Sequence, residues 1–81
     1  MEQLFNLMHR ILRISKDQFR DDFGPKQIQT WDSLTHLGLI SELEDTYDIE
    51  FDVNHISQMR TIGEIKKILK TYGINPDGEA E

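Results

Sequence analysis

The sequence predicts an all-α fold, a small four-helix bundle with a long loop between its first two helices and a short third helix. Apolar residues recur at three- and four-residue spacing in several segments, which is the helical period rather than the strand period. The chain has 81 residues and no cysteine, so we expect one domain held by packing alone and no deeply enclosed active site. This domain is expected over residues 1–74, followed by a flexible acidic tail at residues 75–81.

The first helix is predicted at residues 2–14, and a long loop follows at residues 15–31. The apolar stripe of this helix consists of Leu4, Leu7, Met8, Ile11 and Leu12. Within the loop, Ser15 and Gln18 are spaced to cap one short helical turn, and Gly24-Pro25 marks a turn of the chain. A loop of this length needs anchors to be ordered, and we expect them to be Phe19, Phe23, Ile28 and Trp31.

The second helix is predicted at residues 33–47. An advance of about 100° per residue separates two arcs of this helix. The core side is expected to hold Leu39, Ile40, Leu43 and Tyr47, with His36 at its middle. The opposite arc mixes leucines with carboxylates and consists of Leu34, Leu37, Gly38, Ser41, Glu44, Asp45 and Asp48.

Two shorter helices complete the predicted bundle. The third begins after Asp52 as its N-cap and carries the apolar residues Val53, Ile56 and Met59. The fourth opens with Thr61 and Glu64 at capping-box spacing, and Gly73 fits its C-terminal stop. We expect this fourth helix to bury Ile62, Ile65, Ile68, Leu69 and Tyr72 and to face water with Lys66, Lys67 and Lys70.

The outer arc of the second helix is the first candidate site. Leu34 and Leu37 lie one turn apart beside a strip of acidic residues, as in a docking patch of apolar anchors with a charged rim. The other interpretation is that they are ordinary exposed leucines. Between Lys26 and Arg60 there are seven acidic residues and no lysine or arginine, so nucleic acid is a poor partner and a basic protein surface is a good one.

Ser33, at the mouth of this helix, is the second candidate. The unsatisfied N–H groups and partial positive charge of a helix N-terminus would stabilise a phosphate ester at this position. The alternative is that Asp32 or Ser33 is only an N-cap. The histidines are spread over three segments, so nothing in the sequence activates Ser33 as a nucleophile, and we expect no enzymatic activity.

These residues resemble the acyl carrier proteins. The likeness covers residues 2–72 and centres on Asp32-Ser33-Leu34 at the opening of an acidic second helix. In that family the serine carries 4'-phosphopantetheine, which a separate phosphopantetheinyl transferase attaches from coenzyme A. The resemblance therefore implies a cytoplasmic, monomeric carrier that holds an acyl or aminoacyl group as a thioester on the arm of Ser33, with Asp32 as its motif neighbour.

The resemblance also assigns roles to two further groups of residues. Loading and acyl-transfer enzymes with basic patches would dock on a face formed by Leu34, Leu37, Glu44, Asp45 and Asp48. An acyl chain would fold into a cleft between the second and third helices, lined by Phe51, Ile56 and Met59, for which plain core packing is the alternative.

Three departures from the family distinguish this chain. Thr30-Trp31 stands where the family usually has a glycine and an aliphatic residue, and Gly38 and Ser41 replace positions that are often acidic and apolar. The resemblance with these departures implies a carrier dedicated to a pathway other than housekeeping fatty acid synthesis, such as polyketide or other specialised biosynthesis. Trp31 is expected to fix the loop onto the bundle, and the alternative is that it covers the base of the arm.

Several other functions are excluded or kept as rivals. An EF-hand starting at Asp48 would need glycine where Val53 stands and an acid where Met59 stands, so no metal site is expected. No apolar run is long enough for a membrane span, and the N-terminus does not resemble a signal peptide. The rival of another class is an unmodified helical interaction module that binds a protein through the acidic face of the second helix.

Overall fold

The computed structural model describes residues 2–74, and within this range all regular structure is helical. The elements are α1 (Glu2–Leu12), the 3₁₀ turn η1 (Lys16–Gln18), α2 (Ser33–Tyr47), α3 (Val53–Gln58) and α4 (Ile62–Thr71). The predicted bundle is thus confirmed, with its long connection between α1 and α2 and its short α3. The tail predicted at residues 75–81 lies outside the described residues.

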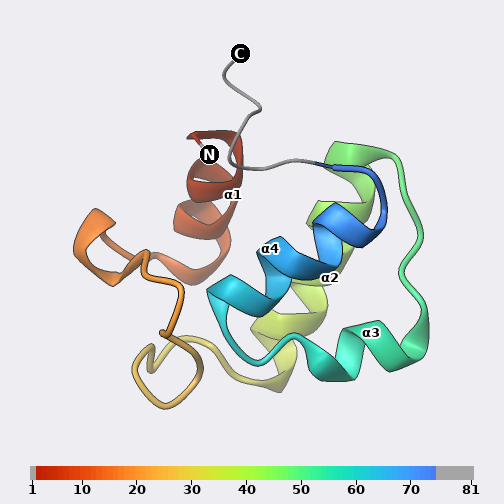
Figure 1. Cartoon of the computed structure of the whole chain (residues 1–81). Coiled ribbons are helices and arrows are strands. Elements are labelled where there is room, and N and C mark those ends of the chain that lie inside the picture. Colours follow the sequence, from red (N-terminus) through yellow and green to blue (C-terminus); the bar gives the residue numbers. More distant parts are fainter. Residues whose placement is uncertain (1, 75–81) are drawn as a thin grey trace.

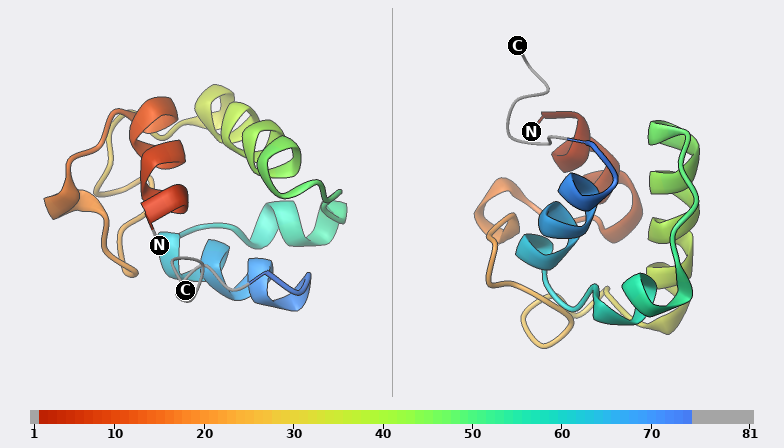
Figure 2. Two further views of the ribbon diagram at one scale, coloured as in Figure 1. Left: turned by 90° about the horizontal axis from the view of Figure 1, so that it is seen from above. Right: turned by 45° about the vertical axis from the view of Figure 1, so that its right-hand side comes forward.

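The helices surround one apolar core. α1 packs against α2, and Figures 1 and 2 show α3 bridging the side between α2 and α4. An ion pair between Arg10 and Glu42, with 2.8 Å between Nη2 and Oε2, also links α1 to α2. Fully buried side chains come from α1, α2, α4 and the loop between α1 and α2, and they include Leu4, Met8, Leu12, Ile14, Ile28, Leu39, Leu43, Ile62, Ile65 and Leu69.

α1 ends two residues earlier than the sequence predicts. Arg13 has a positive φ of 58°, a left-handed conformation that cannot continue a right-handed helix. The chain therefore turns back, and Ile14 enters the core with 1% of its surface exposed. The apolar stripe of the predicted helix ends at Leu12, and Ile14 reaches the core from outside the helix.

The loop between α1 and α2 is ordered by the predicted anchors. Ile28 and Trp31 are buried, whereas Phe19 and Phe23 pack against the core with part of their surface exposed. The predicted helical turn is present as η1, where the backbone N–H of Ser15 donates to Oε1 of Gln18 at 3.1 Å.

This loop is fastened to the beginning of α4. The backbone N–H of Ile62 donates to the Phe23 carbonyl at 3.0 Å, and that of Gly63 donates to the Asp21 carbonyl at 2.9 Å. A Cβ atom added to Gly24 would lie 2.1 Å from the Arg60 carbonyl oxygen. Glycine is therefore required here because two backbone segments touch.

The prediction that Lys66 faces water is wrong. Lys66 is only 8% exposed, and its ammonium group donates to Oδ1 of Asp21 at 2.6 Å. The same nitrogen lies 5.1 Å from the centre of the Phe19 ring, a distance that suits a cation–π interaction. The loop that covers this part of α4 is remote in sequence, so the periodicity of the helix alone did not reveal it.

The two ends of α4 follow the prediction. The Thr61 hydroxyl accepts a hydrogen bond from the Glu64 N–H at 3.2 Å and so caps the first turn. Gly73 has a φ of +85°, the left-handed geometry that ends many helices.

Candidate functional site

The opening of α2 is capped by Asp32 rather than by Ser33. Oδ1 of Asp32 accepts the Thr35 N–H at 2.9 Å, and the Thr35 hydroxyl accepts the Asp32 N–H at 2.8 Å. The Thr35 N–H is the main reason that the pKa of Asp32 is lowered from its ordinary value. Threonine thus fills the place that glutamate or glutamine has in a standard capping box.

The same network fixes the loop that precedes Ser33. The Thr35 hydroxyl donates to the Thr30 carbonyl at 2.7 Å, and the Thr30 hydroxyl donates to the Leu12 carbonyl. The start of α2 is therefore tied to the end of α1, which gives Ser33 a fixed place in the fold.

The Ser33 side chain is exposed and unused by the fold. Its hydroxyl forms no hydrogen bond within residues 2–74, since the capping role belongs to Asp32. Asp32 and Ser33 were the two N-cap candidates, and the structure shows that Asp32 is the N-cap. The Ser33 hydroxyl therefore does not cap the helix.

The anion site expected at this helix end is partly filled by the protein itself. The N–H groups of Thr35 and Leu34 both act on the Asp32 carboxylate. These donors are therefore already used by a fixed negative charge. The N-terminus of α2 is thus not an empty site for a free anion.

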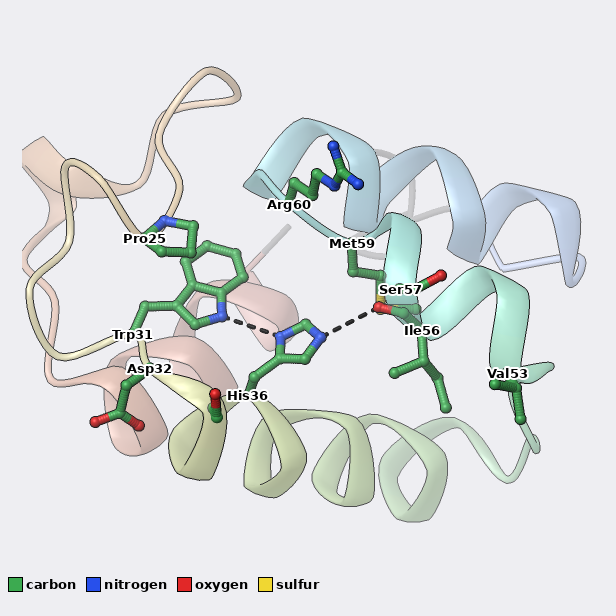
Figure 3. A pocket seen from close by; sticks show the side chains of 10 residues that line it. Pro25, Trp31, Asp32, His36, Val53, Ile56, Ser57, Met59 and Arg60 are labelled. Carbon is green, nitrogen blue, oxygen red and sulfur yellow. Dashed lines mark hydrogen bonds between the residues drawn. The ribbon is translucent and has the colours of Figure 1, made fainter.

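A pocket of about 560 Å³ lies beside Ser33 (Figure 3). Its lining is mostly apolar and comes from the loop before α2, from α2, from α3 and from the connection to α4. Residues that line it besides Ser33 include Trp31, His36, Val53, Ile56 and Met59. The pocket thus joins the serine to the gap between α2 and α3.

Only two of the three expected cleft residues line this pocket. Ile56 and Met59 do so, whereas Phe51 is buried and packs edge-on against Tyr72 with ring centres 5.1 Å apart. Sequence reasoning did not assign His36 to a cleft, because it placed this residue on the core side of α2, and it favoured Trp31 as a loop anchor over a cover for the base of the arm. The position of Trp31 directly before Asp32-Ser33 was the available signal.

The apolar part of the outer surface is larger than predicted. Leu34 is 79% exposed and Leu37 is 62% exposed, so both leucines face away from the core as the helical arcs predicted. Val53, at the start of α3, is also 79% exposed and also lines the pocket. Val53 was grouped with Ile56 and Met59 as an apolar residue of one segment, so it was not singled out from the sequence.

The three acidic residues of the predicted docking face have different surroundings. Asp45 and Asp48 are exposed, and Asp48 ends α2 in a left-handed conformation with a φ of 53°. Glu44 is partly buried, and its Oε2 accepts the backbone N–H of Phe51 at 2.8 Å. Glu44 therefore holds the connection between α2 and α3.

α3 is held against the end of α4 by a second polar cluster. The Tyr72 hydroxyl accepts the Asp52 N–H at 2.8 Å and lies 2.7 Å from Nδ1 of His55. These contacts fix the wall of the pocket that α3 provides.

Two kinds of feature are absent from the described part of the chain. No helix within residues 2–74 is long and apolar enough to cross a membrane. The same residues contain no group of three or more histidine, aspartate or glutamate side chains placed to hold a metal ion.

Comparison with known proteins gives an informative structural likeness. Neither a protein-family model nor a curated protein sequence matches the chain. Among solved structures, the chain is similar to a protein from Mycobacterium tuberculosis that has been assigned as an acyl carrier protein. The two are 25% identical with a TM-score of 0.76, and the match covers 88% of this chain and 95% of the other. The bundle thus resembles the acyl-carrier fold, and this likeness favours a carrier role over catalysis.

Proposed function

We propose that this chain is a carrier protein whose Ser33 bears 4'-phosphopantetheine, and that it delivers an acyl or aminoacyl group to partner enzymes. The observation that carries the proposal is the Ser33 hydroxyl, which is exposed, freed from capping by Asp32 and placed at a pocket. It has this position in a bundle that resembles an acyl carrier protein.

The residues around Ser33 suit a covalently attached arm. The contacts between Asp32 and Thr35 hold the attachment point still, while the exposed serine leaves room for a transferase to reach its oxygen. The bound arm would supply the thiol on which the carried group is held as a thioester. The protein part itself performs no chemistry in this proposal.

The pocket would shelter the apolar part of the carried group. Ile56 and Met59 offer apolar contacts near Ser33, with the Trp31 indole on another wall. Phe51 would touch a carried chain only if the core around it moved, because it is buried against Tyr72. Without movement of the core, the apolar group would therefore contact Ile56 and Met59 but not Phe51.

Partner enzymes would dock on the exposed outer surface. Leu34, Leu37 and Val53 provide apolar anchors, and Asp45 and Asp48 provide a negative rim for basic patches on the partner. Glu44 belongs to this face by position, but its carboxylate accepts a hydrogen bond from the backbone N–H of Phe51. The departures from the family at Thr30-Trp31, Gly38 and Ser41 support a carrier dedicated to a specialised pathway, and a chain without cysteine suits the reducing cytoplasm.

Attachment of the arm can be tested by co-expression with a broad-specificity phosphopantetheinyl transferase, followed by intact mass spectrometry. The wild-type chain should gain the mass of one arm, and Ser33→Ala should gain none. The matched control is Ser57→Ala, because Ser57 is a second exposed serine of the same pocket. This control should be modified like the wild type. An unchanged mass in the wild type would reject the carrier proposal and favour the unmodified interaction module.

The docking surface can be tested by measuring the rate of transfer between a loading enzyme and the next enzyme. Leu34→Ala should slow transfer because it removes an apolar anchor. Asp45→Lys should slow it because it reverses a charge of the negative rim. The control is Asp17→Lys, a charge reversal at an exposed residue of η1. Equal rates in Asp45→Lys and Asp17→Lys would argue against a docking role for the acidic rim, and a collapsed helical circular dichroism signal would argue against the outward placement of either residue.

A further inference from the structure

One side chain in the pocket joins three of the segments that form it. The indole Nε1–H of Trp31 donates to Nδ1 of His36 at 3.0 Å, and Nε2 of His36 lies 3.2 Å from the carbonyl oxygen of Ile56 (Figure 3). We call this set of contacts the histidine bridge. It links the loop before α2, α2 itself and α3, so it holds two walls of the pocket at a fixed separation.

The partners of the bridge determine which nitrogen of His36 carries the proton. An indole nitrogen can only donate a hydrogen bond, and a backbone carbonyl can only accept one. Nδ1 must therefore accept from Trp31, and Nε2 must donate to Ile56. Both bonds exist together only in the neutral imidazole with its proton on Nε2.

Protonation of His36 is incompatible with one of these bonds. A second proton on Nδ1 would face the Trp31 N–H, and neither group could accept. Unlike a hydroxyl partner, the indole cannot reverse the bond by exchanging roles. The rings of Trp31 and His36 lie nearly parallel with centres 6.1 Å apart, so the indole would have to shift to separate the two donors.

We infer that His36 is a pH-sensitive positioning residue, which holds the pocket beside Ser33 in shape when the imidazole is neutral and releases Trp31 when it is protonated. Trp31 is only 3% exposed in the bridged state. Its release widens the pocket and exposes the indole. The inference concerns the protein without any attached arm, so it stands or falls separately from the proposed function.

Charged side chains from two neighbouring segments line the same pocket as His36. Asp32 from the N-cap of α2 and Arg60 from the connection between α3 and α4 line the same pocket, and they carry opposite charges. The titratable residue of α3 is His55, and its ring faces Tyr72. His55 therefore supplies a natural control within the chain.

The first test is to measure the tautomer of His36 by two-dimensional ¹H–¹⁵N NMR that correlates the imidazole nitrogens with the ring carbon-bound protons. With the imidazole neutral at about pH 8, we expect the proton on Nε2 and a hydrogen-bonded Trp31 indole signal. The indole signal should shift with the same midpoint as the His36 ring. A proton on Nδ1 at about pH 8, or an indole signal that ignores the His36 titration, would overturn the inference.

The second test uses the intrinsic fluorescence of Trp31, the one tryptophan of the chain. Quenching by acrylamide should increase as the pH falls through the His36 titration, while the helical circular dichroism signal is retained. His36→Gln keeps an acceptor and a donor without a titrating group, so its quenching should stay low throughout. His36→Leu should show high quenching at every pH, and His55→Gln should respond like the wild type.

These variants separate a pH-sensitive bridge from simple packing. If His36→Gln kept the wild-type pH response, or if His55→Gln abolished it, the assignment of the switch to His36 would be wrong. If His36→Gln failed to fold, the tautomer and the coupled titration in the wild-type protein would still decide the question.

Discussion

Two sides of this bundle are built in different ways. Where the loop meets α4, backbone touches backbone at Gly24, and Lys66 is enclosed by Asp21 and Phe19. Around the openings of α2 and α3, leucine and valine side chains remain exposed and a pocket lies between them. We call these the fastened side and the open side.

The difference separates residues that stabilise the fold from residues that are available for binding. The fastened side consists of contacts that are satisfied within the protein, so changes there should cost folding free energy. The open side contains apolar side chains that are exposed to solvent. Substitutions there should leave folding intact and affect binding. The following substitutions compare matched residues on this basis.

The largest contrast is expected between two leucines of α2. Leu39→Ala should lower the free energy of unfolding by about 2–5 kcal/mol because it leaves a cavity in the core. Leu34→Ala should change it by less than about 0.5 kcal/mol because that side chain is mostly in water. Urea denaturation of both variants measures the difference. Similar losses in the two variants would break the distinction between an inner and an outer arc.

A second contrast compares two glycines. Gly24→Ala should destabilise the fold by about 1–3 kcal/mol because the new methyl group would collide with the Arg60 carbonyl. Gly38→Ala should stabilise it by about 0.5–1 kcal/mol, since nothing lies within 4 Å of a Cβ at that helical position. Thermal unfolding followed by circular dichroism distinguishes the two signs. A stable Gly24→Ala variant would show that the loop is not pressed against α4.

A third contrast compares two aspartates of the loop. Asp21→Asn removes the carboxylate partner of the enclosed Lys66 ammonium and should cost about 1 kcal/mol. Asp17→Asn alters an exposed residue of η1 and should cost less than about 0.5 kcal/mol. The difference should shrink at high salt, which chemical denaturation at two ionic strengths would measure. Equal stabilities at low salt would contradict the enclosed ion pair.

The smallest effect is expected at Asp32 and depends on pH. Because the pKa of Asp32 is lowered below 3.8 in the folded chain, its ionised cap stabilises the fold above that value and loses this effect as the pH falls through the folded pKa. Asp32→Asn can still cap α2 but cannot titrate there. The wild type should therefore lose more stability than Asp32→Asn between about pH 5 and 3. Parallel losses in thermal scans would argue against the cap.

Much of the fold could be predicted from local patterns in the sequence. The start and end of α2 followed from Asp32 and from the apolar spacing, and the stop of α4 followed from Gly73. Each of these features depends on residues within one or two turns. The exposure of Leu34 and Leu37 was predictable for the same reason.

The failures involve partners that lie outside the helix on which the residue stands. Lys66 is enclosed by a loop some 45 residues away, and Glu44 is bound to the backbone of Phe51 beyond the end of its helix. The histidine bridge joins Trp31, His36 and Ile56, and no spacing rule connects these positions. Helical arcs describe the faces of a helix but do not identify what covers them.

The central claim is that Ser33 is the point of attachment on the open side. After co-expression with the transferase, proteolysis and fragmentation mass spectrometry can locate the arm. We expect it on the Ser33 hydroxyl of the peptide that spans the start of α2. An arm found on Ser41 or Ser57, or a fully converted chain with unmodified Ser33, would contradict the account.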